Sequence, residues 1–399
     1  MKILQLCNKP PYPPTDGGAL AMNSITQGLL SMGCEVKVLA ICSDKHPVRQ
    51  HLLTDDYLEN TQFESVYIDL DPHVIDASVA ALCGESYHVK RYISSAFTAK
   101  LIDILTHQEF DIVQLEGLYL TPYVETIRKH SQAHIVMRAH NVEHHIWKQL
   151  ASSCKNPLRR SYLKHLSLTL RAYEIEHIND YDGIACITKQ DAQYFKNAGC
   201  RRPIVSIPFA VTPEPLDNVS EEPATLFHIG SMDWLPNQQS IDWLLNDIWP
   251  VIHKEVAKAR LYLAGRHMTK DLMERHIDGV SIVGEVPDAM YFIGSKQINI
   301  VPLRSGSGIR VKIIEAMSAG KTVISTTVGA EGIDYTDGEN ILIANTPEEF
   351  AHHVKHCIEN PDFCHQIGRN AYNLIATEYD SKHLTDKLIN FYQRLCLHE

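Results

Sequence analysis

The sequence predicts an α/β fold of two Rossmann-like, doubly wound domains placed one after the other. Short apolar runs of strand length alternate with longer segments of helical period along almost all 399 residues. This alternation is typical of parallel sheets whose strands are joined by crossover helices. A segment rich in proline and acidic residues, 208–223, interrupts the pattern near the middle. Because the alternation resumes after it, we expect the chain to divide there.

The expected strands are short runs of aliphatic and β-branched side chains. In the first domain we expect them at 3–7, 35–41, 65–70, 111–116, 134–139 and 183–188. In the second domain we expect them at 225–231, 260–265, 280–284, 298–303 and 322–326. Three helices should follow the last strand, over 347–359, 361–378 and 380–397, the first two opening with a proline in the first turn.

The domain boundaries follow from this order and from the charge. We place the first domain at 1–211, a linker at 212–223 and the second domain at 224–380. Residues 1–210 carry 21 basic and 22 acidic side chains, a net charge of −1, and the remaining residues carry 16 and 26, a net charge of −10. The predicted boundary therefore lies where the charge balance changes.

Composition excludes several classes of protein. An apolar fraction of 44% with 21% charged residues is that of a globular chain rather than of a disordered or collagen-like one. The net charge of −11 argues against a general affinity for nucleic acid. The ten cysteines are scattered without CxxC pairs, there is no signal-peptide pattern, and no apolar run approaches the ~20 residues that span a bilayer. We therefore expect a cytoplasmic protein.

The most informative stretch follows the strand expected at 298–303. Gly306, Ser307 and Gly308 form a small turn before a helix expected to start near Ile309, and such helix starts bind anions through backbone amides. Arg310 and Lys312 place two cations at this helix end, where they oppose the helix dipole. That arrangement favours a bound phosphate or diphosphate; the alternative is a solvated basic helix end.

Three further positions along the chain contribute candidate ligand-binding residues. Glu315 lies three residues after Lys312 and can either pair with it or accept hydrogen bonds from ribose hydroxyls. Gly17 and Gly18 precede the first long helix, and Gly230 and Ser231 end the first strand of the second domain. The Gly17-Gly18 pair alone is equally compatible with a plain loop and helix start.

The segment HIVMRAHNVEHHIW, residues 134–147, supports two hypotheses. His140, Glu143 and His144 match HxxEH, a zinc-peptidase motif in which both histidines bind the metal and the glutamate is the general base. However, the preceding residues form a buried strand, so His140 should lie at a strand end rather than on a helix. A histidine there can instead hydrogen-bond a sugar or polarise a leaving group.

Residues 148–171 carry six basic side chains and no acidic one, interleaved with leucine and tyrosine. A solvated helix face accounts for this pattern. The alternative is a peripheral contact with anionic lipid.

Taken together, these residues resemble the retaining nucleotide-sugar glycosyltransferases of family 4, which have the GT-B fold. The resemblance runs from the DGG turn at 16–18 through GSMDWLPN (230–237), RLYLAG (260–265) and GEVPD (284–288) to IIEAMSAGKTVISTTVGAEGI (313–333). It implies two facing domains, the donor held mainly by the second and the acceptor mainly by the first. It also implies a last helix, 381–399, that crosses back to the first domain, and no requirement for a metal or other cofactor.

The resemblance assigns roles to individual residues. Glu315 matches the family glutamate that holds the donor ribose, whereas Ser307 stands where the usual pattern has a glutamate that contacts the donor sugar. Arg310 and Lys312 stand in for an Arg and a Lys that the family usually has after the first strand of this domain, as in a subgroup with GSMDWxPN and R-x-K-x-x-E-A-M. His140 matches a strand-end histidine near the reacting sugar.

We therefore predict a metal-independent hexosyltransferase in surface or exopolysaccharide assembly. His140, Arg310 and Lys312 are its expected catalytic residues, and Glu116 and Asn141 its expected acceptor-side residues. The donor would be a UDP- or GDP-sugar and the acceptor a glycan or lipid-linked saccharide. The alternatives are a non-catalytic sugar-nucleotide binder and a zinc peptidase.

Overall fold

The computed structural model describes residues 1–14, 16–71, 86–154, 156–211, 219–305 and 309–397. Two compact units account for them. Unit 1 comprises Met1–Ala210 and Ser381–Glu399, and unit 2 comprises Val211–Asp380. Gly306, Ser307 and Gly308 lie outside the described residues, as does most of the predicted linker. The end of that linker is tied to unit 2, since Lys321 Nζ pairs with Glu221 (2.6 Å) and Lys296 Nζ with Glu222 (2.7 Å).

Unit 1 is built on a parallel sheet with the strand order β3-β2-β1-β4-β5-β6-β7. The strands are β1 (Lys2–Cys7), β2 (Glu35–Cys42), β3 (Glu64–Tyr67), β4 (Ile112–Glu116), β5 (His134–Ala139), β6 (Gly183–Cys186) and β7 (Ile204–Ser206). Six were predicted from the sequence. The edge strand β7 was missed because its three residues carry too little apolar pattern to separate them from a loop.

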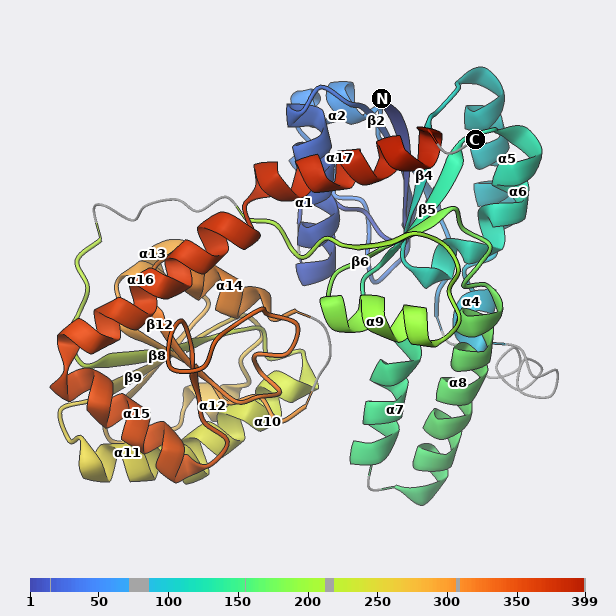
Figure 1. The fold of residues 1–399 in the computed structure, drawn as a ribbon. Coiled ribbons are helices and arrows are strands. Elements are labelled where there is room, and N and C mark those ends of the chain that lie inside the picture. Colours follow the sequence, from blue (N-terminus) through green and yellow to red (C-terminus); the bar gives the residue numbers. More distant parts are fainter. Residues whose placement is uncertain (15, 72–85, 155, 212–218, 306–308, 398–399) are drawn as a thin grey trace. The chain divides into compact units, whose positions relative to one another are not determined.

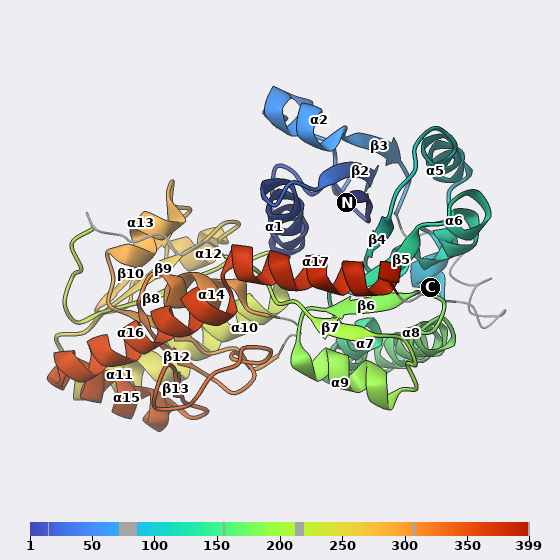
Figure 2. The same cartoon turned by 45° about the horizontal axis from the view of Figure 1, so that its top comes forward.

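Helices cover both faces of this sheet (Figures 1 and 2). They are α1 (Gly17–Ser31), α2 (Asp55–Thr61), α4 (Tyr87–Lys90), α5 (Ser95–His107), α6 (Val124–His130), α7 (Glu143–Ser153), α8 (Pro157–Glu176), α9 (Lys189–Asn197) and α17 (Ser381–Leu397), with 3-10 turns η1 (Gln50–Leu52) and η2 (Leu118–Tyr123). Along β1, Leu4 and Leu6 pack with α5 and α6, whereas Ile3 and Cys7 pack with α1 and α17. Two buried faces explain why the central strands are apolar at nearly every position.

The last helix, α17, belongs to unit 1 although the chain reaches it from unit 2, as the predicted crossover requires. It lies beside α1 (Figure 1). A Cβ atom placed on Gly28 of α1 would lie only 2.3 Å from Thr385 Oγ1 of α17. The glycine therefore permits this close approach of the two helices.

Unit 2 repeats the architecture with the parallel order β10-β9-β8-β11-β12-β13. Its strands are β8 (Thr225–Ile229), β9 (Arg260–Ala264), β10 (Val280–Gly284), β11 (Ile298–Val301), β12 (Thr322–Ser325) and β13 (Leu342–Ile343). Its helices are α10 (Leu235–Trp243), the π-turn η3 (Leu244–Ile248), α11 (Trp249–Glu255), α12 (Lys270–Met273), α13 (Ala289–Gly294), α14 (Val311–Ser318), α15 (Pro347–Glu359) and α16 (Pro361–Glu378). The two-residue strand β13 was not predicted, for the same reason as β7.

Candidate functional site

In each sheet the strand order reverses once beside its first strand. The reversal lies between β1 and β4 in unit 1 and between β8 and β11 in unit 2. Loops at the carboxyl ends of such strands are where open parallel sheets bind ligands. The residues that follow these strands therefore form one candidate site on each unit.

In unit 1, the strand ends bring Glu116 and His140 together. Cys7, Glu116 and Arg138 lie level with one another on β1, β4 and β5. His140 follows β5 directly, and its Nε2 donates to Glu116 Oε2 at 2.7 Å. This leaves Nδ1 of His140 to a ligand, because no described residue hydrogen-bonds it, and 15% of the side chain is exposed.

The Glu116 carboxylate is completely buried. Gln5 Nε2 donates to its Oε1 at 2.7 Å, and Gln114 is a second amide donor to the same oxygen. Burial by itself raises the pKa of Glu116, but the hydrogen bond and charge of His140, together with Arg138, outweigh it and hold the pKa below its ordinary value. We predicted Glu116 as an acceptor-side residue. Its side chain has no exposed surface in the structure, so a role on the acceptor side would have to pass through His140, and that role stays a prediction.

Asn141 and Glu143 continue this site into the start of α7. Tyr119 OH donates to Glu143 Oε2 at 2.8 Å, and Asn141 is a second hydrogen-bonding partner of the same carboxylate. Burial and the nearby charge of Glu174 raise the pKa of Glu143 to about 7. Asn141, predicted on the acceptor side, is half-buried here.

The zinc-peptidase hypothesis does not fit this geometry. His140 precedes α7, which begins at Glu143, so His140 and His144 do not share a helix face. Both ring nitrogens of His144 have partners, Nδ1 with Glu174 Oε2 (2.5 Å) and Nε2 with Tyr194 OH (3.2 Å). Among the described residues no group of three or more His, Cys, Asp or Glu side chains is arranged to hold a metal ion. The HxxEH match is a coincidence of sequence.

Gly17 and Gly18 form the first turn of α1. Asp16 caps the helix by accepting from Ala19 N at 2.9 Å, and Lys9 Nζ pairs with the same carboxylate oxygen at 2.5 Å. A Cβ atom on Gly18 would lie 2.9 Å from Lys9 Nζ. The predicted glycine turn therefore holds a lysine that the sequence did not single out.

In unit 2, Gly230 and Ser231 lie beside Lys312. Lys312 Nζ donates to Asn237 Oδ1 at 2.7 Å, and Asn237 Nδ2 donates to Ser231 O at 2.7 Å. A Cβ atom on Gly230 would lie 2.6 Å from Lys312 Nζ and 2.9 Å from Asn237 Nδ2, so a larger residue here would displace the ends of these two side chains. The loop after β8 and the first turn of α14 thus form one cluster, as the prediction of a shared donor site requires.

Lys312 Nζ also contacts His228 Nε2 at 3.2 Å. His228 Nδ1 lies 2.7 Å from the carbonyl oxygen of Ile300, so Nδ1 carries the proton and Nε2 accepts from Lys312. No carboxylate lies within 4.0 Å of Nζ in the part of the chain that the structure describes. Burial, reinforced by the charge of Arg310, lowers the pKa of Lys312 to about 7.

Arg310 is buried just before α14 rather than on it. The helix begins at Val311, later than predicted, because Arg310 has an extended backbone (φ −88°, ψ 92°) and serves as the N-cap residue. Its guanidinium lies over the Trp234 ring, 5.5 Å from the ring centroid. Burial lowers its pKa to about 10, against the opposing effect of Glu331. Arg310 and Lys312 therefore reach the same end of α14 from different backbone positions.

Glu315 is half-buried on α14, and its burial raises its pKa to about 7. The predicted alternative, an ion pair with Lys312, does not form among the described residues, since Lys312 donates to Asn237 and His228 instead. Within the described part of the chain, the Glu315 carboxylate thus has no cation within ion-pair distance.

Comparison with known proteins shows which family and which folds the chain is similar to. Residues 223–360 match the family described as Glycosyl transferases group 1. The fold is similar to that of Anabaena HepE in complex with UDP (TM-score 0.68, 14% identity, 99% of this chain and 100% of that chain). It is also similar to sucrose-phosphate synthase from Thermosynechococcus elongatus (TM-score 0.69, 13% identity, 100% of both chains). The chain has the GT-B fold.

A sequence relative points in the same direction. An uncharacterized 44.6 kDa protein in the cps region of Klebsiella pneumoniae is 24% identical over 410 residues, which cover 96% of this chain and 97% of the relative. The predicted fold is thus confirmed as GT-B, and the resemblance to glycosyl transferases is confirmed for residues 223–360. The subgroup and the roles of individual residues stay predictions.

The candidate site of unit 2 contains residues that the sequence did not reveal. His228 and Asn237 position Lys312, and Trp234 covers Arg310. Asn237 and Trp234 stand inside the GSMDWLPN motif, so their motif was recognised but their roles were not. His228 lies within a strand, where a single buried histidine carries no pattern that separates structural from functional roles.

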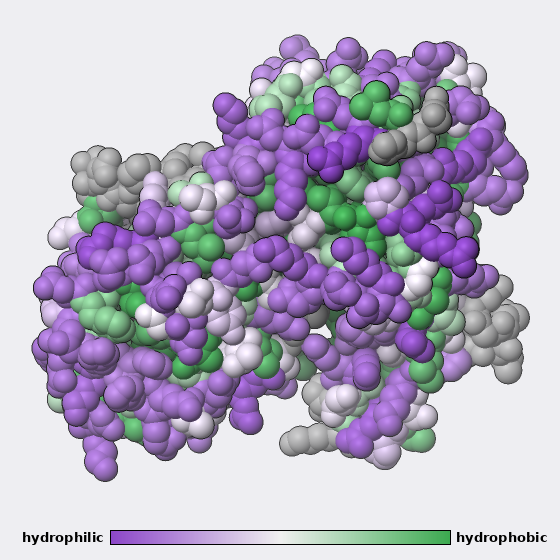
Figure 3. Space-filling model, in the orientation of Figure 1, coloured by the Kyte–Doolittle hydropathy of each residue, from purple (hydrophilic) through white to green (hydrophobic). Residues whose placement is uncertain are grey.

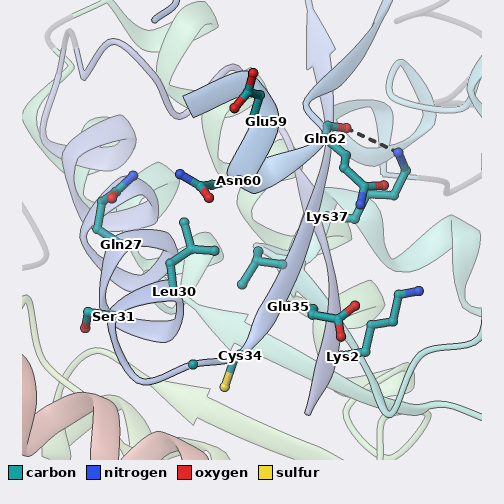
Figure 4. A pocket seen from close by; sticks show the side chains of 12 residues that line it. Lys2, Gln27, Leu30, Ser31, Cys34, Glu35, Lys37, Glu59, Asn60 and Gln62 are labelled. Carbon is teal, nitrogen blue, oxygen red and sulfur yellow. Dashed lines mark hydrogen bonds between the residues drawn. The ribbon is translucent and has the colours of Figure 1, made fainter. Parts of the chain in front are cut away.

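A separate pocket of about 520 Å³ lies at the amino ends of the strands in the unit 1 sheet, away from the carboxyl ends that form the candidate site (Figure 4). Lys2 and Glu35, which begin β1 and β2, are among its lining residues. Its Lys37 donates to Gln62 O at 3.2 Å and pairs with Glu64 at 2.8 Å. Lys37 is therefore already neutralised by Glu64. The pocket also lies at the amino ends of β1 and β2, whereas the predicted ligand site lies at the carboxyl ends of the strands, so the two are different sites.

Proposed function

We propose that the protein is a retaining glycosyltransferase that moves a hexose from a nucleoside-diphosphate sugar to a hydroxyl of a glycan or a lipid-linked saccharide. A role in surface polysaccharide assembly is supported by the relative in a cps region. The similar structure of Anabaena HepE is a complex with UDP, which supports a nucleotide donor. Unit 2 would hold the donor without a metal ion, and unit 1 would hold the acceptor.

The surroundings of Lys312 carry this proposal. Its ammonium group donates to two neutral acceptors, His228 Nε2 and Asn237 Oδ1, and none of the described carboxylates neutralises it. A partly buried cation without an anion is poorly stabilised. A diphosphate bound over the first turn of α14 would supply the missing negative charge and would also meet the helix amides.

Two further residues complete the proposed donor site. Arg310 would stabilise the charge that develops on the diphosphate, which is an electrostatic role in the transition state. Glu315 would accept hydrogen bonds from the ribose hydroxyls as a carboxylate. No described cation pairs with it, which leaves its oxygens to such a ligand.

The proposed reaction needs no covalent intermediate with the protein. The acceptor oxygen forms a bond to the anomeric carbon on the face from which the diphosphate departs. The bond from that carbon to the diphosphate oxygen breaks, and the acceptor proton passes to the departing diphosphate. In unit 1, His140 Nδ1 would hydrogen-bond the reacting sugar while Glu116 fixes the ring through Nε2.

Calorimetry against UDP, GDP and ADP and their common sugars tests the donor assignment. We expect one nucleotide to bind, and Lys312→Ala to weaken its binding about a hundredfold, the loss typical of a charged hydrogen bond to a buried partner. The exposed Lys258 of unit 2 provides the control, because Lys258→Ala should bind as the unmodified chain does. Equal nucleotide affinity in Lys312→Ala and Lys258→Ala would contradict the assignment of the site.

Product analysis distinguishes a transferase from a protein that only binds the sugar nucleotide. If the donor binds but neither glycan nor lipid-linked acceptors yield a glycosylated product, the protein binds without transferring. The anomeric configuration of any product, determined by NMR, tests retention.

A further inference from the structure

Helices α7 and α8 form an antiparallel hairpin that extends from the sheet of unit 1 (Figure 1). One face of α8 is buried: Leu166 and Leu170 pack with residues of α4, α7 and η2. Ser167 Oγ donates to His144 O at 2.9 Å, which joins the two helices at the base. The hairpin is therefore a fixed part of unit 1, and among the described residues the opposite face of α8 is exposed.

That opposite face carries large hydrophobic side chains in water. Leu158 is 83% exposed, Leu168 is 63% exposed and Tyr162 is 44% exposed. Single exposed leucines are ordinary. At 3.6 residues per turn, Leu158 and Leu168 lie about 80° apart around α8, whereas Tyr162 lies about 120° from Leu168. Figure 3 shows hydrophobic and hydrophilic residues side by side over this hairpin.

The same helices carry an unbalanced positive charge. Their exposed basic residues are Lys148, Arg159, Arg160, Lys164 and Arg171. No acidic residue occurs between Lys148 and Tyr173, in a chain whose net charge is −11. At 3.6 residues per turn, Arg160, Lys164 and Arg171 form one stripe about 40° wide around α8, next to Leu168 and on the far side of it from Leu158. We call Leu158, Leu168 and the stripe of Arg160, Lys164 and Arg171 the hairpin face.

We propose that the hairpin face docks on an anionic lipid bilayer, with Leu158 and Leu168 entering the headgroup region and the basic stripe contacting lipid phosphates. Combined apolar and basic side chains on one helix face suit a membrane surface. Each Lys or Arg held near an anionic surface raises binding roughly fivefold.

Two other occupants fit the hairpin face less well. A symmetric pair of chains would bring its basic residues against the same residues of the second copy, and like charges in contact oppose association. A nucleic acid would meet the basic stripe but would leave the exposed leucines without a role. No helix among the described residues is long and apolar enough to cross a membrane, so the proposed contact is peripheral.

The docking goes beyond the proposed transfer and does not depend on it. The base of the hairpin lies next to the unit 1 site, since α7 begins at Glu143, three residues after His140. If the proposed function holds, a chain docked in this way would meet a lipid-linked acceptor at the surface of the bilayer.

Vesicle sedimentation with the full chain tests the proposal. We expect binding to vesicles that contain phosphatidylglycerol, little binding to phosphatidylcholine alone, and release at high salt. Arg160→Glu with Lys164→Glu should weaken binding by about a hundredfold, and Leu158→Ser with Leu168→Ser by about tenfold. The controls are Lys254→Glu with Lys258→Glu for charge and Leu52→Ser for an exposed leucine elsewhere, which should bind as the unmodified chain does.

Circular dichroism and nucleotide calorimetry on each variant separate docking from folding and from donor binding. No affinity for anionic vesicles at low salt, or equal affinity in the hairpin and control variants, would overturn the proposal. Sedimentation equilibrium that shows a dimer lost in Leu158→Ser with Leu168→Ser, without vesicle binding, would assign the hairpin face to a second copy. Vesicle binding without nucleotide binding would leave the docking standing and contradict the proposed transfer.

Discussion

Nε2 of His228 accepts a hydrogen bond from Lys312 Nζ at 3.2 Å, while Nδ1 of the same ring faces the carbonyl oxygen of Ile300 at 2.7 Å. The Ile300 carbonyl thereby fixes the neutral tautomer of the histidine. Burial and the charge of Lys312 hold the pKa of His228 well below its ordinary value, so the ring stays an acceptor. Lys312 is thus positioned by groups that orient it without neutralising it.

Asn237→Asp should weaken the binding of the nucleotide. The new carboxylate would replace the amide oxygen that lies 2.7 Å from Lys312 Nζ and would form an ion pair with it. It would also repel a diphosphate, so we expect nucleotide affinity to fall about tenfold to a hundredfold. Nucleotide calorimetry measures this loss, and thermal unfolding of the same samples shows whether loss of the Asn237 Nδ2 hydrogen bond to Ser231 O affects the fold.

Lys312 also predicts how nucleotide binding depends on pH. Its pKa is about 7, so the empty site loses its positive charge above that pH. A diphosphate binds the protonated form, and its affinity should therefore fall from about pH 7 to about pH 9, by up to about tenfold per pH unit. Lys312→Arg should remove this decline, because a guanidinium stays charged over the range. Calorimetry across this range checks the result, and an affinity independent of pH in the unmodified chain would contradict it.

The sequence was sufficient for the fold because the elements that form it are strongly patterned. Strands such as β1 and β11 are buried along almost their whole length since both faces of each sheet are covered, and helices α15 and α16 open with the expected prolines. The strands that were missed, β7 and β13, are the short strands at the sheet edges. A run of two or three residues does not establish a period of two.

The sequence predicted which loops form the candidate site but not the contacts between their side chains. Gly230 and Lys312 could be assigned to one site because both follow strands at the point where the strand order reverses. The hydrogen bonds of Lys312 could not be predicted, because His228 and Asn237 approach it across 84 and 75 residues of sequence. Similarly, nothing in the order of residues shows that Glu116 is fully buried and not exposed to an acceptor.

Glu116→Gln should slow transfer without changing donor binding. The Gln side chain keeps the volume but removes the charge that holds His140 through Nε2 at 2.7 Å. Loss of a group that orients a catalytic histidine lowers kcat by about tenfold to a thousandfold. Steady-state kinetics and nucleotide calorimetry measure the two effects. Glu125→Gln, which removes an exposed carboxylate of unit 1, is the matched control and should leave both unchanged. A loss of nucleotide affinity in Glu116→Gln would show a structural effect instead.

Glu143→Gln should raise the free energy of unfolding relative to the unmodified chain. The gain should be larger at about pH 8 than at about pH 5. Burial first, and then Glu174, raise the folded-state pKa of Glu143 to about 7, whereas an unfolded chain ionises this group near pH 4.3. Between these values the folded state holds more protons than the unfolded state, so rising pH reduces the stability of the unmodified chain. The introduced glutamine would carry no charge at either pH and could still accept the hydrogen bond from Tyr119. The difference in the free energy of unfolding between variant and unmodified chain should grow by on the order of 1–3 kcal/mol over this range. Urea unfolding at both pH values measures it, and a difference that shrinks as the pH rises would show that the carboxylate is stabilised in its charged form.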